Sequence, residues 1–244
     1  MALLAGAGPM GLATIDYAIH GPTRPGTLVV TDIDQARLDR AASVLTVEDA
    51  RKHGVELVYM NTGGDEGEAK LTSMTEGAGY NDVFVFAPVA PLIEQASRIL
   101  GLNGCLNFFA GPSKTDFSAE INFYDVHYMQ HHVVGSSGGN TDDMREALQL
   151  MGEERINPAV MITHIGGLDS APETIQKLPS VPGGRKLIYT QVSMPLTALD
   201  DFTELGESDP FFAELSRITV ANNGLWSVEA ETYLLENAKS ILQG

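Results

Sequence analysis

Three closely spaced glycines near the amino terminus are the residues of this sequence whose spacing could do chemistry. Gly6, Gly8 and Gly11 stand in the order G-x-G-x-x-G, with Pro9 and Met10 before the last of them. An apolar run precedes this segment and apolar residues at helical spacing follow it, so the glycines join an expected strand to an expected helix. In that setting Gly6 permits a tight turn, Gly8 lets the backbone approach a pyrophosphate, and Gly11 lets the helix pack close to the strand. The helix N-terminus adds N–H groups and a partial positive charge that favour phosphate.

An acidic residue stands where a dinucleotide requires one. Asp32 ends the apolar run 27–31 and lies roughly 20 positions beyond Gly11, as this motif needs. A carboxylate there accepts hydrogen bonds from the adenosine ribose and repels a 2′-phosphate, and the adjacent Ile33 carries no positive charge. The arrangement favours NAD(H) over NADP(H), although Arg37, one helical turn further on, keeps NADP(H) open. A flavin, or a glycine turn without a ligand, are the alternatives.

Two further turns are candidates for the same site. Residues Ala87, Pro88 and Val89 follow the fourth expected strand, and Ala110 and Gly111 lie at the end of the fifth. Ligands of open parallel sheets bind beyond the carboxyl ends of the strands, so we expect both turns to border the cofactor. Ordinary strand-ending turns are the alternative interpretation.

Composition excludes several classes of partner. The 244 residues carry a net charge of −17, and their 15 basic residues form no run, which disfavours nucleic acid and anionic membranes. A single cysteine, Cys105, allows no intrachain disulfide, and its apolar surroundings predict a buried core thiol. No signal peptide and no apolar stretch of about 18 residues is present, so we expect a cytoplasmic protein.

Apolar runs that alternate with helical patterns predict an α/β fold, a doubly wound parallel six-stranded Rossmann sheet. The expected strands lie at residues 3–5, 27–31, 55–60, 83–87, 105–110 and 133–134. Helix stripes are expected at residues 12–19, 38–45, 92–100 and 144–151. A C-terminal return segment and a helical tail follow, which divides the chain into 1–152, 153–193 and 194–244.

Helix ends are marked by residues that favour caps. Asp34, Thr141 and Ser227 are expected to cap three helices, and Asp209 to cap a fourth that begins with a proline. Gly21 is expected to end the first helix.

The histidines do not form a defensible metal site. His127 and His131 are four residues apart, but His131 and His132 run into the sixth expected strand and no carboxylate or cysteine completes a ligand set. His164 is expected to be structural. We therefore predict no catalytic residue and no metal ligand within this chain.

With these residues in hand, the chain resembles the coenzyme-binding half of the zinc-dependent medium-chain alcohol and polyol dehydrogenases. The resemblance covers about residues 1–192. Its anchors are Ala5 to Leu12, Val30-Thr31-Asp32, Asp82 to Val85, Val134-Gly135-Ser136 and Ile162-Thr163-His164. A narrower likeness to the branch that reduces L-sorbose 1-phosphate is carried by Asn122 to Tyr128, Gly135 to Asn140 and Gly224-Leu225-Trp226.

The resemblance implies reversible hydride transfer between a nicotinamide and a sugar, sugar-phosphate or polyol, polarised by zinc. In the family an amino-terminal GroES-like catalytic domain brings the zinc ligands. Here the glycines begin at residue 6, so we expect that domain to be absent, the chain to be truncated and inactive alone, and zinc to occur only in a full-length enzyme. The family also implies a homodimer. The alternatives are a stand-alone nucleotide-binding or redox-sensing module, or a subunit whose partner chain supplies the catalytic domain.

Overall fold

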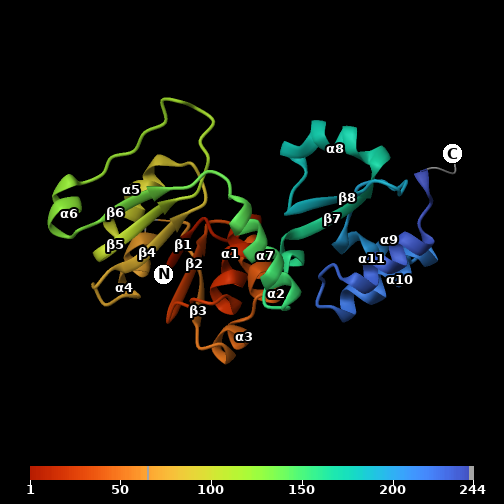
Figure 1. Cartoon of the computed structure of the whole chain (residues 1–244), viewed down its shortest axis with the longest axis horizontal. Coiled ribbons are helices and arrows are strands. Elements are labelled where there is room, and N and C mark those ends of the chain that lie inside the picture. The colour runs from red at the N-terminus through yellow and green to blue at the C-terminus, as the bar shows by residue number, and fades with distance from the viewer. Residues whose placement is uncertain (65, 242–244) are drawn as a thin grey trace. The chain divides into compact units, whose positions relative to one another are not determined.

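A computed structural model describes residues 1–64 and 66–241 and divides the chain into two compact units (Figure 1). The first unit spans Met1–Ile156 and the second begins at Asn157. No helix of the described residues is long and apolar enough to cross a membrane.

The first unit is built on a parallel six-stranded sheet. Its strands are β1 (Ala2–Leu4), β2 (Thr27–Asp32), β3 (Glu56–Asn61), β4 (Tyr80–Val85), β5 (Leu100–Phe108) and β6 (His132–Gly135). They lie in the order β3-β2-β1-β4-β5-β6, and every pairing is parallel. From β1 the chain adds β2 and β3 on one side, and then adds β4, β5 and β6 on the other side. This change of side next to β1 confirms the doubly wound Rossmann sheet.

All six strands differ from their predicted limits at one end or both, and two of these differences have a clear local cause. Ala5 lies outside β1 because its φ of +53° turns the chain out of the strand. Leu100 begins β5 rather than ending the preceding helix, since the N–H of Tyr80 bonds the carbonyl of Ile99 and Tyr80 pairs with Leu100. In both places the hydrophobic pattern is continuous across the boundary, so the pattern alone does not locate it.

Helices cover the sheet between its strands. They are α1 (Pro9–His20), α2 (Gln35–Val44), α3 (Val47–Lys52), α4 (Gly67–Ser73), α5 (Ala90–Arg98), α6 (Phe123–Tyr128) and α7 (Thr141–Gly152). On one face, Leu71 of α4 and Ile93 of α5 share a buried cluster with Leu4, Val85 and Leu106 of the sheet. Alternate residues of the strands point to the opposite face, so each inner strand is apolar on both sides.

The caps explain where three of these helices begin or end. The Asp34 carboxylate accepts the N–H groups of Ala36 and Arg37, as predicted. The prediction that Thr141 caps α7 is wrong: the cap is Asn140, which forms a reciprocal capping box with Asp143. Gly21 ends α1 in an extended conformation, and its glycine is required because a Cβ there would lie 2.3 Å from the carbonyl oxygen of Tyr17.

The second unit joins the return segment and the helical tail, which the sequence prediction kept apart. Its strands β7 (Ile162–Gly167), β8 (Arg185–Tyr189) and β9 (Thr197–Ala198) form a mixed sheet in the order β8-β7-β9. Its helices are α8 (Ala171–Lys177), α9 (Phe202–Gly206), α10 (Pro210–Ala221) and α11 (Val228–Asn237), with short 3-10 turns at Pro158–Met161, Leu168–Ser170, Leu178–Ser180 and Leu199–Asp201. Asp209 and Ser227 cap α10 and α11, as predicted.

Buried apolar residues hold the second unit together across its two parts. Ile165 of β7 lies in one cluster with Phe202, Leu215 and Leu234 from the tail helices. Trp226 belongs to the same cluster, and its indole N–H donates to the hydroxyl of Tyr189 at 2.8 Å. The tail therefore packs on the return segment.

We predict that Cys105 reacts slowly in the folded chain. Burial and the neighbouring Asp82 carboxylate raise the pKa of this thiol, although the side chain is only half-buried. A raised pKa lowers the thiolate fraction at a given pH, and the thiolate is the reactive form. Alkylation at about pH 8 should be slower in buffer than in denaturant. Equal rates under the two conditions would contradict this account of the thiol.

Candidate functional site: the glycine-rich edge of the parallel sheet

The turn after β1 brings the backbone of α1 against the sheet. The N–H of Gly6 donates to the carbonyl of Thr31 at 2.7 Å, which ties the turn to the end of β2. A Cβ on Gly6 would lie 2.6 Å from the Cβ of Leu3, and a Cβ on Gly11 would lie 1.8 Å from the carbonyl oxygen of Gly6. Real side chains do not approach that closely, so these two glycines are required by the packing itself.

Gly8 differs from its two neighbours in the motif. It is the N-cap of α1, its φ is −78°, and no atom lies within 4 Å of the position that a Cβ would occupy. No side chain caps this helix N-terminus, and Pro9 occupies its first turn. The fold therefore does not require glycine at position 8, whereas an anion that approaches the helix N-terminus along its backbone would.

Asp32 lies at the end of β2 and holds the turn. Its Oδ2 accepts the N–H of Ala7 at 3.3 Å, and its Oδ1 accepts the N–H of Asp34 at 3.1 Å. The residue is 4% exposed. A carboxylate offers about four acceptor positions, so two remain for a ligand hydroxyl.

The residues beside Asp32 determine which charges a phosphate on the adenosine ribose would meet. Ile33 is exposed and Arg37 is largely exposed. The guanidinium of Arg37 lies 3.5 Å from a carboxylate oxygen of Asp34, which partly neutralises its charge. A phosphate at this position would meet one arginine and two carboxylates.

The other predicted turns reach the same edge because β1 pairs with β4, and β4 with β5. Val89 is the N-cap of α5 and is exposed, with Ala87 and Pro88 before it. The N–H of Ala110 donates to the carbonyl of Val85 at 3.0 Å, and nothing lies within 4 Å of a Cβ built on Gly111.

Among the described residues, the three histidines near β6 form no group of metal ligands. Helix α6 ends at Tyr128, so His127 and His131 do not share a helical face. His132 Nε2 lies 3.0 Å from Asn103 Oδ1, and His131 is buried with no hydrogen-bond partner among the described residues. His164 pairs with the hydroxyl of Thr163, and burial followed by the charge of Lys186 lowers its pKa.

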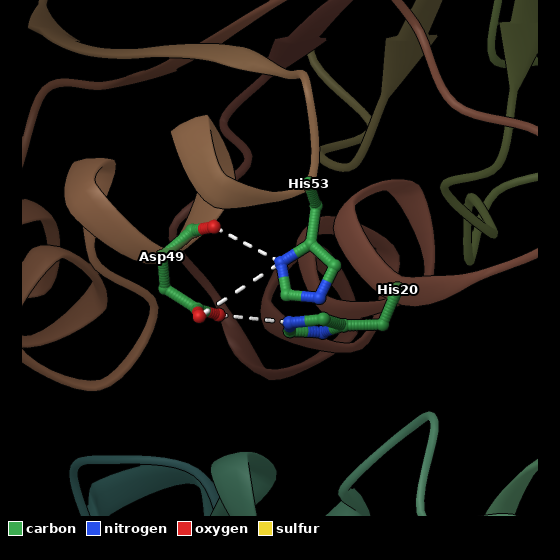
Figure 2. A group of neighbouring side chains, drawn as sticks. All are labelled: His20, Asp49 and His53. Carbon is green, nitrogen blue, oxygen red and sulfur yellow. Dashed lines mark hydrogen bonds and ion pairs between the residues drawn. The ribbon is translucent and has the colours of Figure 1, made fainter.

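One group of potential metal ligands was missed by the sequence reasoning. His20, Asp49 and His53 come together at the ends of α1 and α3 (Figure 2). The spacing of Asp49 and His53, four residues apart on one helix, is a signal that the sequence does contain. The approach of His20 is set by the length of α1 and is not visible in the sequence.

A sequence profile of the family described as "Zinc-binding dehydrogenase" matches residues 9–153. Mannitol-1-phosphate 5-dehydrogenase of Aliivibrio fischeri is 52% identical over 97% of this chain and 56% of its own length. L-sorbose 1-phosphate reductase of Klebsiella pneumoniae is 46% identical over 98% of this chain and 55% of its own length. The chain thus spans about half the length of the curated relatives it matches.

Solved structures share the fold. An alcohol dehydrogenase from E. coli CFT073, described as short-chain and complexed with NADH, matches with a TM-score of 0.59 and 15% identity, over 78% of this chain and 52% of its own. A zinc-binding dehydrogenase from Sinorhizobium meliloti 1021 bound to NADP matches with a TM-score of 0.59 and 21% identity, over 78% of this chain and 52% of its own.

The different surroundings of Gly8 and Gly11 predict different effects on stability. Gly11→Ala should lower the free energy of unfolding by about 1–3 kcal/mol, because the new Cβ overlaps the Gly6 carbonyl. Gly8→Ala should change it by less than about 1 kcal/mol, because its Cβ meets open space. Denaturant unfolding of both variants measures the difference, and a Gly11→Ala chain as stable as the wild type would refute the close packing of α1.

Proposed function

Because this chain belongs to the zinc-binding dehydrogenase family, we propose that its first unit binds a nicotinamide dinucleotide at the carboxyl edge of the parallel sheet. The observation that carries the proposal is the open space in front of Gly8, at an uncapped helix N-terminus. The pyrophosphate lies there against the start of α1, where the helix dipole favours negative charge. The turns at Ala87–Val89 and Ala110–Gly111 border the nicotinamide half of the ligand.

We propose NAD(H) as the preferred cofactor. The two free acceptor positions of Asp32 receive the hydroxyls of the adenosine ribose. A 2′-phosphate would meet the carboxylates of Asp32 and Asp34, and Arg37 is already paired with Asp34. NADP(H) is the weaker alternative, and the solved neighbours include proteins bound to either dinucleotide.

The substrate class follows from the relatives. Their names describe the oxidation of mannitol 1-phosphate and the reduction of L-sorbose 1-phosphate. We propose that the whole protein moves a hydride between NAD(H) and a sugar-phosphate or polyol in the same way, in the cytoplasm. A nucleotide-binding or redox-sensing module without catalysis, which would use the same open space in front of Gly8, is the second candidate.

The residues at the glycine-rich edge do not fit the zinc of this family. Among the described residues, the group of three metal-binding side chains that lie close together is His20, Asp49 and His53, and these belong to the ends of α1 and α3. Cys105 lies within β5 with a raised pKa. The proposed binding of NAD(H) therefore involves no zinc ligand at this edge, and we expect the 244 residues alone to bind NADH without oxidising it.

The binding site predicts the effect of one added side chain. Gly8→Val should weaken NADH binding about 100-fold, because its side chain fills the space that the pyrophosphate needs. Fluorescence titration of NADH measures the affinity. Gly26→Val is the matched control, because a Cβ at Gly26 also meets nothing within 4 Å. Gly26 precedes the first residue of β2, whereas the proposed cofactor site lies beyond the last residue of that strand, Asp32. Equal NADH affinity in the two variants would contradict the proposed binding site.

The preference between cofactors is tested at Asp32. Asp32→Asn keeps an acceptor for the N–H of Ala7 but removes the charge that repels a 2′-phosphate. The ratio of NADPH to NADH dissociation constants should fall by about tenfold. A ratio that stays unchanged would remove Asp32 from the proposed basis of specificity.

We also propose that the chain forms a homodimer through β6. This strand is at the edge of the sheet, and Val133 and Val134 are 48% and 43% exposed. Further exposed apolar side chains occur in the neighbouring segments, namely Phe123, Tyr124, Tyr128, Met144 and Leu148. An apolar edge strand is stabilised when it pairs with its two-fold mate, which gives one continuous sheet.

Light scattering at a protein concentration of about tens of micromolar should give a dimer mass for the wild type and a monomer mass for Val134→Lys. A monomeric wild type would contradict the pairing.

A further inference from the structure

The ends of α1 and α3 place two imidazoles and a carboxylate together, away from the proposed cofactor site. His20 is the last residue of α1, Asp49 lies in the first turn of α3, and His53 follows its last residue (Figure 2). His20 Nε2 lies 2.8 Å from Asp49 Oδ2, and His53 Nδ1 lies 3.8 Å from Asp49 Oδ1. His53 Nδ1 also donates to the backbone carbonyl of Asp49 at 3.0 Å, so the lone pair that His53 can offer an ion is on Nε2. Each residue offers one ligand atom, and the three atoms lie within 4.8 Å of one another.

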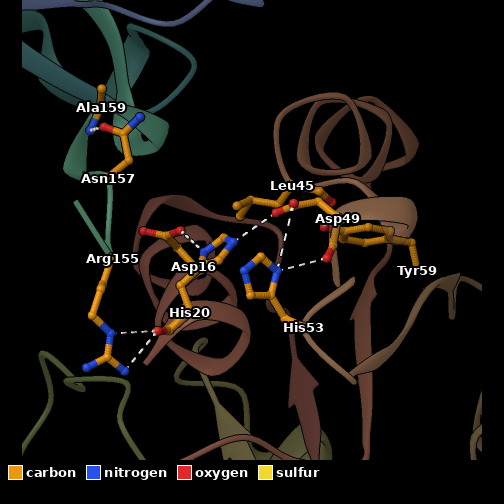
Figure 3. Close-up of polar contacts among 9 residues, drawn as sticks. All are labelled: Asp16, His20, Leu45, Asp49, His53, Tyr59, Arg155, Asn157 and Ala159. Carbon is orange, nitrogen blue, oxygen red and sulfur yellow. Dashed lines mark hydrogen bonds and ion pairs between the residues drawn. The ribbon is translucent and has the colours of Figure 1, made fainter. Parts of the chain in front are cut away.

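A buried carboxylate orients the first of these imidazoles. Asp16, one turn before His20 on α1, holds His20 Nδ1 at 2.8 Å, and its side chain is 5% exposed (Figure 3). This contact directs Nε2 of His20 toward Asp49. Metal-binding histidines are commonly held in this way, with the second ring nitrogen bonded to a carboxylate.

The backbone on both sides of the cluster is also held. Arg155 donates from Nε and Nη2 to the carbonyl of His20, both at 3.2 Å, and Arg24 donates weakly to the carbonyl of His53 at 3.4 Å. These two guanidinium groups bind carbonyl oxygens rather than the proposed ligand atoms. The two carboxylates, Asp16 and Asp49, supply the negative charge that faces the imidazoles.

We propose that His20, Asp49 and His53 form a binding site for a divalent transition-metal ion of the Zn²⁺ type, with Asp16 as a positioning residue. Two imidazole nitrogens and one carboxylate oxygen, with water in a fourth position, are a donor set that Zn²⁺ accepts in tetrahedral geometry. Mg²⁺ and Ca²⁺ prefer sites made of oxygen alone.

The observed spacing needs only small changes to hold such an ion. Ligand atoms about 2.0–2.1 Å from a tetrahedral ion lie roughly 3.3 Å apart. His20 Nε2 lies 2.8 Å from Asp49 Oδ2, and one ligand atom from each of the three residues lies within 4.8 Å of the other two, so small side-chain movements reach that spacing. The hydrogen bond between His20 and Asp49 contains a proton, and the ion takes its place between the nitrogen and the oxygen. The side chains of His20, Asp49 and His53 are 19%, 42% and 34% exposed, so an ion and its water can enter.

The ion would act as a structural link. It joins the end of α1 to α3, two segments that are separated by α2 and β2 in the chain. The 12 residues of α1 separate the site from Gly8 by about 18 Å along the helix axis. Metal binding should therefore stabilise the first unit and leave NADH affinity unchanged.

The first test uses the whole chain after treatment with a chelator. Equilibrium dialysis against Zn²⁺ should show one equivalent bound with a dissociation constant on the order of micromolar or tighter, and the Tm should rise with Zn²⁺ concentration. Co²⁺ should bind with the visible absorption of a tetrahedral ion, and Mg²⁺ in excess should not displace it. The absence of stoichiometric Zn²⁺ binding would overturn the proposal.

Variants locate the bound ion. His53→Gln removes one ligand at the end of α3 and should weaken Zn²⁺ binding by at least 10- to 100-fold. Asp16→Asn removes the carboxylate that orients His20 and should weaken Zn²⁺ binding by about 10- to 100-fold. His127→Gln, an exposed histidine on α6, is the matched control and should bind Zn²⁺ like the wild type. Circular dichroism confirms that each variant is folded. If His53→Gln binds Zn²⁺ as the wild type does, or His127→Gln loses it, the ion is bound elsewhere and the proposal is wrong.

Discussion

The first unit depends on the close approach of the Gly11 backbone to the carbonyl of Gly6, where a Cβ on Gly11 would lie 1.8 Å from the oxygen. This approach fixes where α1 begins relative to β1 and therefore where its N-terminus points. Because α1 runs unbroken for 12 residues from that point, the same contact also sets the position of His20 at its other end. One backbone approach thus determines both the place proposed for the dinucleotide and one ligand of the proposed metal site.

Asp32 connects the second strand to this arrangement. Its carboxylate bonds the N–H groups of Ala7 and Asp34, so the group that we propose to select the ribose also shapes the turn. A cofactor that bonds Asp32 would act on the backbone of the glycine-rich turn directly. This shared role explains why a change at Asp32 has to preserve an acceptor if it is to report on specificity rather than on folding.

Much of the fold could be predicted from the sequence because its parallel strands are apolar on both faces and are separated by helical patterns. The parallel six-stranded sheet, the turn after β1 and the caps at Asp34, Asp209 and Ser227 agree with the local residue types. Ala5 and Leu100 were placed in the wrong elements because apolar residues continue across those boundaries. The predicted cap Thr141 lies one residue too late, because Asn140 and the Asp143 side chain bond each other's backbone N–H groups in a reciprocal capping box. The cluster of His20, Asp49 and His53 depends on tertiary packing between helices, which no local pattern contains.

The central claim is that the glycine-rich edge of the first unit, and not another surface, holds NAD(H). Amide hydrogen exchange measured with and without NADH tests it most directly, because exchange reports on each backbone segment separately. We expect slower exchange with NADH at residues 6–12, 32–37 and 87–89, and unchanged exchange at residues 47–53. Protection confined to other segments, or no protection at residues 6–12 at saturating NADH, would contradict it.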